Sequence, residues 1–325
     1  MRPITVSVGP LAAASATKIS VSQNVPAAQA IVIDGAAAVG YVANNIATAQ
    51  SVSGAAAVTL NGSLVSGGVA VIGSDPVLRR PTRVVIVSAA NDSGITFTVS
   101  GLGPDGVTAQ TETVTGANVS RTSTVKSFYS VSSVTTSGST AGNITVGTNG
   151  RAVLDVARRV LLTSGGNDSG VTFTIAGLDA AGNAISETLT GGSSAAVYSV
   201  LDYAVILHIL ASGATASTLT VGTNGIASSL PIAMDPYAAG PTFIRAVVSG
   251  TVNYTVEQSA DDPNSPTNPV ARASMSWDAT SGPIIGAAAS ASAQVAAVPL
   301  FFRVTVNSGT GSVSTIFVQS YGPNF

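Results

Sequence analysis

Residues 91–98 read Asn-Asp-Ser-Gly-Ile-Thr-Phe-Thr, and residues 167–174 repeat them as Asn-Asp-Ser-Gly-Val-Thr-Phe-Thr. The match continues on both sides at an offset of about 75 residues. Two further motifs recur, Glu-Thr-Val/Leu-Thr-Gly at 112–116 and 187–191, and Thr-Val-Gly-Thr-Asn-Gly at 145–150 and 220–225. The offset slips by about one residue between Gly101 and Glu112, in a turn-rich segment, and turns tolerate insertions better than strands do. The sequence therefore predicts two tandem copies of one folded unit.

Each copy has the pattern of a β structure. Residues 95–100 alternate Ile, Phe and Val with Thr, Thr and Ser, as a half-buried strand does. Turn signals recur about every 8–12 residues, which is typical of a sandwich or barrel. Residues 195–210 are ambiguous by themselves, but their alignment with residues 122–134 predicts a strand. We therefore expect an all-β protein with tandem β-sandwich-like repeats.

The composition predicts an uncharged surface. Of the 325 residues only 9% are charged and 5% aromatic, whereas 45% are hydrophobic. Charged residues normally make up about a quarter of a globular chain. We expect sheets with uncharged outer faces, much of which lies against partner chains. A monomeric sandwich with a Ser/Thr-coated surface remains the alternative.

Charge and cysteine content exclude several function classes. A net charge of −2 provides no basic surface for nucleic acid or for an anionic membrane. Because the chain has no cysteine, it has no disulfide or thiolate nucleophile, and its redox compartment is undetermined. The first residues lack a secretory signal pattern. The apolar run Ile284–Phe302 is mostly Ala and Ser, which predicts two strands joined by a loop rather than a membrane span.

An internal echo marks the N-terminal segment. Residues 25–35 resemble residues 52–62 at an offset of about 27, and each copy predicts an apolar strand that ends in Asp-Gly or Asn-Gly. We expect an N-terminal arm or small sheet that acts as a docking element. The predicted organisation is an arm or small β domain at 1–78, a first β repeat at 79–152, a second at 153–230 and a C-terminal β-sandwich at 231–325.

These patterns resemble a known class of proteins. The Gly-Ile/Val-Thr-Phe-Thr-Val/Ile strands at 94–99 and 170–175, with the Glu-Thr-Val/Leu-Thr-Gly motif, resemble repeats in virion structural proteins of tailed bacteriophages. Residues 250–258, the following Asp261-Asp262-Pro263 and residues 302–313 are similar to the last domain of the same proteins. The resemblance covers most of residues 83–325. It implies a head-decoration or head-fibre protein, or in some cases a neck or tail component, and it implies no catalytic residues.

Candidate catalytic residues have structural explanations. The sole histidine, His208, lies in an apolar strand, where a structural or interface role is expected rather than a Ser-His-Asp triad. Asp92 and Asp168, and likewise Glu112 and Glu187, hold equivalent places in the two repeats. Paired carboxylates can hydrolyse glycosides, but Asn-Asp-Ser-Gly is also a turn sequence. We therefore expect no catalytic and no cofactor-binding residues.

Two binding alternatives concern the C-terminal region. Asp261 and Asp262, with Asn264 and Asn268, are oxygen ligands that Ca²⁺ accepts, but prolines explain their loop without a metal. Aromatic side chains could form a sugar-binding platform, although such residues are more often core. The residues concerned are Trp277, Tyr254, Phe301 and Phe302. We assign no metal site and no cofactor.

The expected function is structural. The resemblance implies a virion protein, assembled in the host bacterial cytoplasm, that decorates or stabilises the capsid through β-rich interfaces with the major capsid protein or other virion proteins. We expect a homo-oligomer, with a trimer suggested by the symmetry of known capsid sites, and neither a nucleic-acid nor a membrane partner. The alternatives are a neck, collar or tail component of the virion, a module that binds a host-surface glycan and, last, an enzyme such as a glycan depolymerase.

Overall fold

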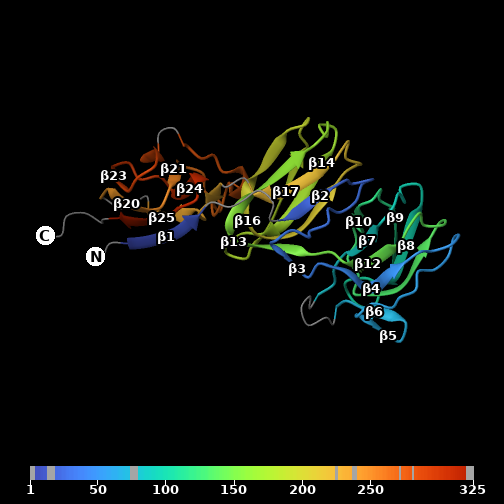
Figure 1. Cartoon of the computed structure of the whole chain (residues 1–325). Helices are drawn as coiled ribbons and strands as arrows, with labels where there is room; N and C mark the ends of the chain where they lie inside the picture. The colour runs from blue at the N-terminus through green and yellow to red at the C-terminus, as the bar shows by residue number, and fades with distance from the viewer. Residues whose placement is uncertain are drawn as a thin grey trace.

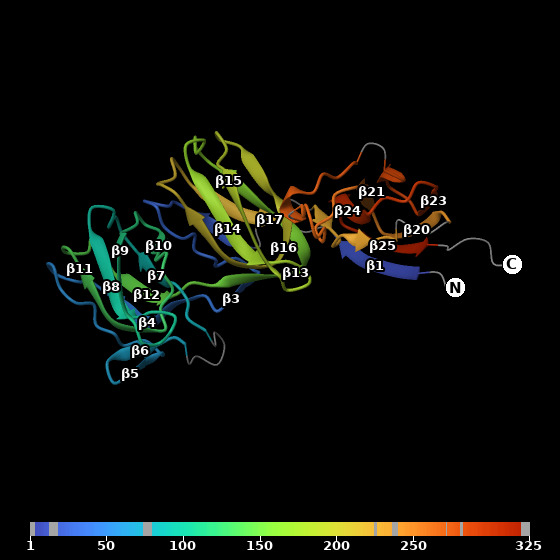
Figure 2. The same ribbon diagram turned by 180° about the vertical axis from the view of Figure 1, so that it is seen from behind.

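The computed structural model describes residues 4–12, 19–73, 80–223, 226–235, 240–270, 272–279 and 282–319. Over these ranges the protein is all-β, its strands pair antiparallel, and its one helical segment is the 3₁₀ turn η1 (Arg272–Ser274). Three units follow one another in a row (Figure 1). We name them the first-repeat, second-repeat and C-terminal units. The view from behind shows the same order, with β1 and β25 together in the C-terminal unit (Figure 2).

The first-repeat unit is a sandwich of two sheets, with strand orders β10-β7-β12-β4 and β5-β6-β11-β8-β9. Phe97 and Phe128 are completely buried in the core cluster between them. The strands are β4 (Val42–Gln50), β5 (Val65–Ser66), β6 (Val69–Val71), β7 (Val84–Ser88), β8 (Thr96–Leu102), β9 (Ala109–Thr115), β10 (Arg121–Ser123), β11 (Ser130–Thr136) and β12 (Ile144–Thr148).

In the second-repeat unit the strands form one continuous sheet, because the long strand β16 pairs with both β13 and β14. The ambiguous segment forms the continuous strand β16, in which Tyr198 pairs with Leu161 of β13 and Ile209 pairs with Ile175 of β14. The prediction of a strand there is confirmed. The strands are β2 (Ser20–Gln23), β3 (Ala38–Val39), β13 (Arg151–Ser164), β14 (Thr172–Leu178), β15 (Ala184–Thr190), β16 (Ala196–Ala211) and β17 (Leu219–Thr223), in the order β15-β14-β16-β13-β17-β2, with β3 beside β13.

The C-terminal unit packs the sheet β1-β25-β20-β23 against a second sheet in which β24 pairs with β18, β19 and β21, and β21 with β22. Phe302 and Phe317 stack at 5.4 Å between the two sheets. The run Ile284–Phe302 contains strands, as expected. The strands are β1 (Ile4–Ala12), β18 (Ala227–Ser228), β19 (Ile232–Ala233), β20 (Thr242–Ser249), β21 (Val252–Ser259), β22 (Ile284–Ala287), β23 (Ala291–Val295), β24 (Phe301–Gly309) and β25 (Ser312–Gln319).

The N-terminal strands complete all three units. β1 pairs with β25 of the C-terminal unit, β2 pairs with β17 of the second-repeat unit, and β4 pairs with β12 of the first-repeat unit. The chain therefore runs outward along the row of units and then returns through the two repeats. The expectation of a small separate sheet is wrong for described residues 4–12 and 19–73, since the strands β1 to β6 all belong to the larger sheets of the three units. Strands paired in a larger sheet are more stable than an isolated two-stranded hairpin, which is marginal in water.

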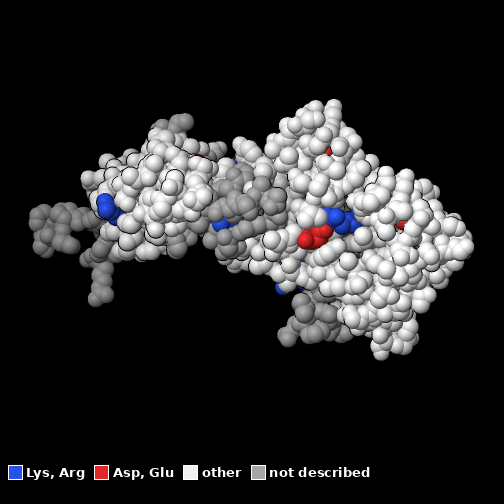
Figure 3. Space-filling view, viewed as in Figure 1, with Lys and Arg blue, Asp and Glu red and all other residues white. Residues whose placement is uncertain are grey.

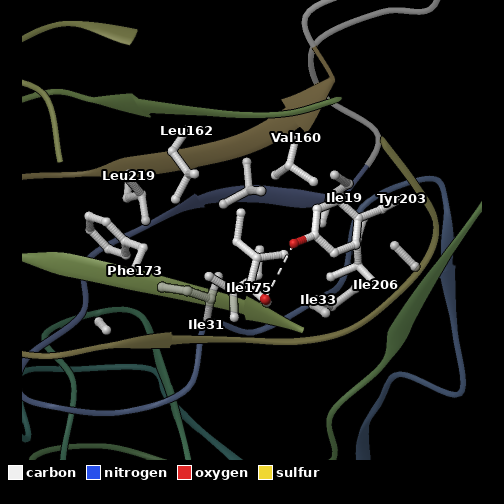
Figure 4. Packing of buried hydrophobic residues seen from close by; sticks show 14 of the residues in the cluster. Ile19, Ile31, Ile33, Val160, Leu162, Phe173, Ile175, Tyr203, Ile206 and Leu219 are labelled. Carbon is white, nitrogen blue, oxygen red and sulfur yellow. Dashed lines mark hydrogen bonds between the residues drawn. The ribbon is translucent and has the colours of Figure 1, made fainter. Parts of the chain in front are cut away.

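Apolar side chains of the arm are part of the second-repeat core. Ile19, Ile31 and Ile33 are completely buried and belong to the same cluster as Val160 and Phe173. Figure 4 shows these side chains facing one another across the two layers, with the Tyr203 hydroxyl donating to the Ile175 carbonyl at 3.4 Å. Burial of one such isoleucine stabilises the folded state by roughly 1.5–3 kcal/mol, so this unit depends on the arm for its stability.

The echo in the arm corresponds to a repeated structure. Gln23 donates to the Val32 carbonyl at 2.9 Å and accepts from the Val32 N–H at 3.0 Å; Gln50 makes the same pair with Thr59 at 2.8 and 2.9 Å. These side chains substitute for a neighbouring strand. The strands expected at 30–33 and 57–60 are therefore wrong, because both segments have only isolated bridges, Ala30 to Leu210 and Ala57 to Thr135.

The first echo completes the second repeat, and the second echo completes the first. Ile31 N–H donates to Ile209 O at 2.8 Å, and Val58 N–H donates to Val134 O at the same distance. Residues 31 and 58 are equivalent in the echo, just as residues 209 and 134 are equivalent in the repeats. Residues 25–35 therefore pack with the second repeat and residues 52–62 with the first. We call this the crossed arrangement.

Candidate functional site

The repeated aspartates organise turns. Asp92 and Asp168 are buried, and their Oδ1 atoms accept from the N–H groups of Ala141 and Ala216, each at 2.7 Å. The preceding residue, Asn91, accepts from the N–H of Ser93 at 3.2 Å, and Asn167 does the same for Ser169. These are the local bonds of an Asx turn. The aspartates therefore connect neighbouring loops in each repeat.

The repeated glutamates hold a bend in the chain. Glu112 accepts from Val125 N–H at 2.7 Å and Lys126 N–H at 2.8 Å, and Glu187 accepts from Val200 and Leu201 N–H at 2.9 and 3.1 Å. In the first-repeat unit these N–H groups lie between β10 and β11, which belong to different sheets, and in the second-repeat unit they lie within the continuous strand β16. Burial raises the pKa of Glu187, and the two backbone donors oppose that rise. Both carboxylates are bonded to backbone, which explains the glutamate in the repeated motif.

The glycine that ends this motif is required by close packing. A Cβ on Gly116 would lie 2.3 Å from the Asp92 carbonyl oxygen, and one on Gly191 would lie 2.5 Å from the Asp168 carbonyl oxygen. No side chain fits at such distances. The repeated aspartate, glutamate and glycine therefore form one structural set in each unit.

Asp261 and Asp262, considered above as calcium ligands, also bond to backbone. Asp261 accepts from Ser276 N–H at 2.5 Å, and Asp262 accepts from Asn264 N–H at 2.8 Å. The backbone N–H of Asn268 donates to Ser265 Oγ at 3.2 Å. Within the described ranges no three His, Asp or Glu side chains lie close enough to hold a metal ion.

Three of the four candidate platform aromatics are core residues. Tyr254 and Phe302 are completely buried, and Phe301 is 7% exposed. Trp277 is half-buried, and the Arg303 guanidinium carbon lies 4.4 Å from its ring centroid. Arg303 also pairs with Glu257. The aromatics therefore provide no open platform; they hold the C-terminal unit together.

A cavity of about 70 Å³ lies between the second-repeat and C-terminal units. Asp179 and Arg272 form an ion pair of 3.3 Å across this junction, and Asp202 accepts from Ser228 N–H at 3.3 Å. Burial raises the pKa of Asp202 to about 6, although Arg159 and Arg303 act in the opposite direction. One water takes up about 30 Å³ of liquid, so this cavity has room for about two waters and is an inter-unit joint rather than a ligand pocket.

His208 lies in strand β16, where its sequence pattern places it. Its half-buried side chain lines a cavity of about 210 Å³ together with Arg80, Arg83 and Arg151. Burial, and then the Arg83 charge, lower the pKa of His208 to about 4. The described lining includes no carboxylate to orient the imidazole as a triad requires. The sequence offered no signal for this grouping because the arginines come from separate segments.

An apolar sheet face is exposed on the C-terminal unit. Phe243 and Val247 of β20 are 47% and 50% exposed, and Ile316 of β25 is 40% exposed. Ile316 lies directly opposite Arg245, which stands between the other two, so the four side chains share one face. Figure 3 shows how few charged side chains occur on one side of the whole molecule. This face is the clearest candidate docking surface.

Comparison with known protein families, curated proteins and solved structures finds no match to this chain. Among the described residues, no helix has the length and apolarity needed to cross a membrane.

Proposed function

We propose that the chain is a structural protein of a bacteriophage virion that decorates or stabilises the capsid. The repeated polar residues support this reading because they bond to backbone and maintain the fold. Three stacked β units with a weakly charged surface provide long faces for other proteins rather than a site for chemistry. The proposed partners are the major capsid protein and further copies of this chain.

The exposed face of the C-terminal sheet carries the proposal. Three large apolar side chains, Phe243, Val247 and Ile316, stand together on it and are each at least 40% exposed. Clustered exposed apolar residues are characteristic of protein interaction sites. The N-terminal arm, by contrast, is paired within the chain. We therefore place the capsid contact on the C-terminal unit instead of the arm.

Particle incorporation tests this placement. Phe243→Asp replaces the largest apolar side chain of the face by a negative charge, and we expect its incorporation into particles to fall at least tenfold, since burying a charge is costly. Val107→Asp is the matched control, because Val107 is 80% exposed in a turn of the first-repeat unit. Equal incorporation of both variants, measured by quantitative mass spectrometry of purified particles, would contradict the docking surface.

Copy number tests the function itself. Quantitative mass spectrometry of purified virions should find the chain in hundreds of copies, near-stoichiometric with the major capsid protein, if it covers the capsid. Six to about a dozen copies would favour the alternative of a neck, collar or tail component. Absence from the particles would overturn the virion proposal.

A further inference from the structure

The cavity beside His208 lies between the first-repeat and second-repeat units. Arg80 and Arg83 reach it from the segment before β7, Arg151 from the first residue of β13 and His208 from β16. Its volume is about 210 Å³. One water takes up about 30 Å³ of liquid, so the cavity has room for a small ligand of several atoms.

The described lining of this cavity contains three arginines and no carboxylate. Ion pairs among the described residues join Arg121 to Asp34, Arg272 to Asp179 and Arg303 to Glu257, and none of them involves Arg80, Arg83 or Arg151. The described residues that line the cavity include neither Asp nor Glu. Three of the chain's 13 Lys and Arg residues therefore surround one cavity without a carboxylate partner there.

Arg83 is a partly buried charge in this lining. Its Nε donates to the Val125 carbonyl at 2.9 Å, and the carboxylate of Glu112, which favours its charge, is already bonded to the backbone of Val125 and Lys126. Burial lowers the pKa of Arg83 to about 10, so the group remains charged at neutral pH. A partly buried charge is stabilised by an opposite charge and by hydrogen bonds to it.

We propose that this cavity binds a multivalent oxyanion, of the sulfate, phosphate or polycarboxylate class, through Arg80, Arg83 and Arg151. The planar guanidinium group donates two parallel hydrogen bonds to such oxygens. The three arginines lie on the segment before β7 and on β13, so the anion would bridge the first-repeat and second-repeat units. This inference does not depend on the virion proposal.

His208 is the reporter for the test, because it is the chain's only histidine. The full chain, labelled with ¹³C-histidine, is titrated at pH 7 with sodium sulfate and, separately, with sodium chloride at matched ionic strength. Sulfate should cause a saturable change in the imidazole resonance that chloride does not. In a pH titration, bound sulfate should raise the pKa of His208 above about 4, because a nearby anion favours the imidazolium form.

Variants assign the effect to the arginines. Arg83→Gln and Arg151→Gln should each weaken sulfate binding at least tenfold. Arg245→Gln is the control, because Arg245 is exposed on the C-terminal unit, donates to Ser292 Oγ at 3.0 Å and should leave binding unchanged. Arg151→Gln also tests the proposal if Arg83→Gln fails to fold. Sulfate responses identical to those of chloride, or full binding by both cavity variants, would overturn it.

Discussion

At the residue scale, the repeated acidic side chains act on the backbone. Glu112 and Glu187 each accept two backbone N–H groups, one donor to each carboxylate oxygen. Hydrogen bonds to a charged group contribute about 1.5–3 kcal/mol, more than neutral ones. Because both units use the same pair of hydrogen bonds, both repeats have a glutamate at this position.

The first prediction concerns this bond pair. Glu187→Gln keeps one acceptor oxygen but turns an N–H group toward the other backbone donor, so the free energy of unfolding should fall by about 1–3 kcal/mol. Chemical denaturation followed by fluorescence or circular dichroism measures the change. Asp262→Asn, in the exposed loop, should change stability by less than about 0.5 kcal/mol. A Glu187→Gln chain as stable as the unaltered protein would contradict the structural role.

Asp202 gives a pH-dependent prediction. Its pKa in the folded protein is raised to about 6 by burial, so the protonated form is favoured on folding. The resulting stabilisation is fully present below about pH 4, the pKa in the unfolded chain, and is lost as the pH rises through about 6. At pH 8 the buried charge lowers the stability of the folded state.

Asp202→Asn should remove that cost. We expect the free energy of unfolding to rise on the order of 2 kcal/mol at pH 8 and to change little at pH 4. Urea titrations at the two pH values measure the difference. A loss of stability at pH 8 would mean instead that attraction to Arg159 and Arg303 outweighs burial.

At the element scale, side chains of the arm replace missing strand partners. Gln23 bonds to both backbone groups of Val32 in the second-repeat unit, and Gln50 does so with Thr59 in the first-repeat unit. Gln23→Ala should lower amide protection in β13–β17 by about tenfold or more and spare β7–β12, whereas Gln50→Ala should do the reverse. Hydrogen exchange with mass spectrometry measures both. Loss of protection in the same unit for both variants would contradict the crossed arrangement.

Much of the element structure could be predicted from the sequence. The repeats, the strand at β16 and the longer first-repeat loop between β8 and β9 all appear where alternation and turn residues place them. Residues 30–33 could not be assigned correctly, because their backbone partners are the side chains of Gln23 and Asn149 in addition to a strand. Hydrophobic alternation indicates which side chains are buried, but it does not indicate which groups form hydrogen bonds with the backbone.

The site was less predictable than the fold. The arginine cavity depends on residues 80–83, 151 and 208, which are separated in sequence and meet only through the packing of two units. The sequence favoured core roles for the aromatic residues of the C-terminal region, and Tyr254 and Phe302 are completely buried. No local pattern distinguishes an exposed apolar strand residue such as Phe243 from a buried one without knowledge of which face is covered.

At the scale of the whole molecule, the outward and returning parts of the chain assemble each unit together. Residues 25–35 and 52–62 resemble each other, and so do the two repeats. From the sequence alone, either segment could therefore pack against either repeat. The structure selects the crossed arrangement, with Ala30 beside Leu210 and Ala57 beside Thr135. The same out-and-return path also brings β1 beside β25 in the C-terminal unit.

Disulfide trapping tests this path most directly, since the chain has no cysteine of its own. Opposed residues of this antiparallel type have Cα atoms about 4.5 Å apart, within the range that a disulfide spans. Mild oxidation should therefore link the double variants Ala30→Cys/Leu210→Cys and Ala57→Cys/Thr135→Cys, as measured by peptide mass spectrometry. The mismatched variants Ala30→Cys/Thr135→Cys and Ala57→Cys/Leu210→Cys should remain reduced. Efficient linkage of the mismatched pairs, with none in the matched pairs, would contradict the out-and-return path.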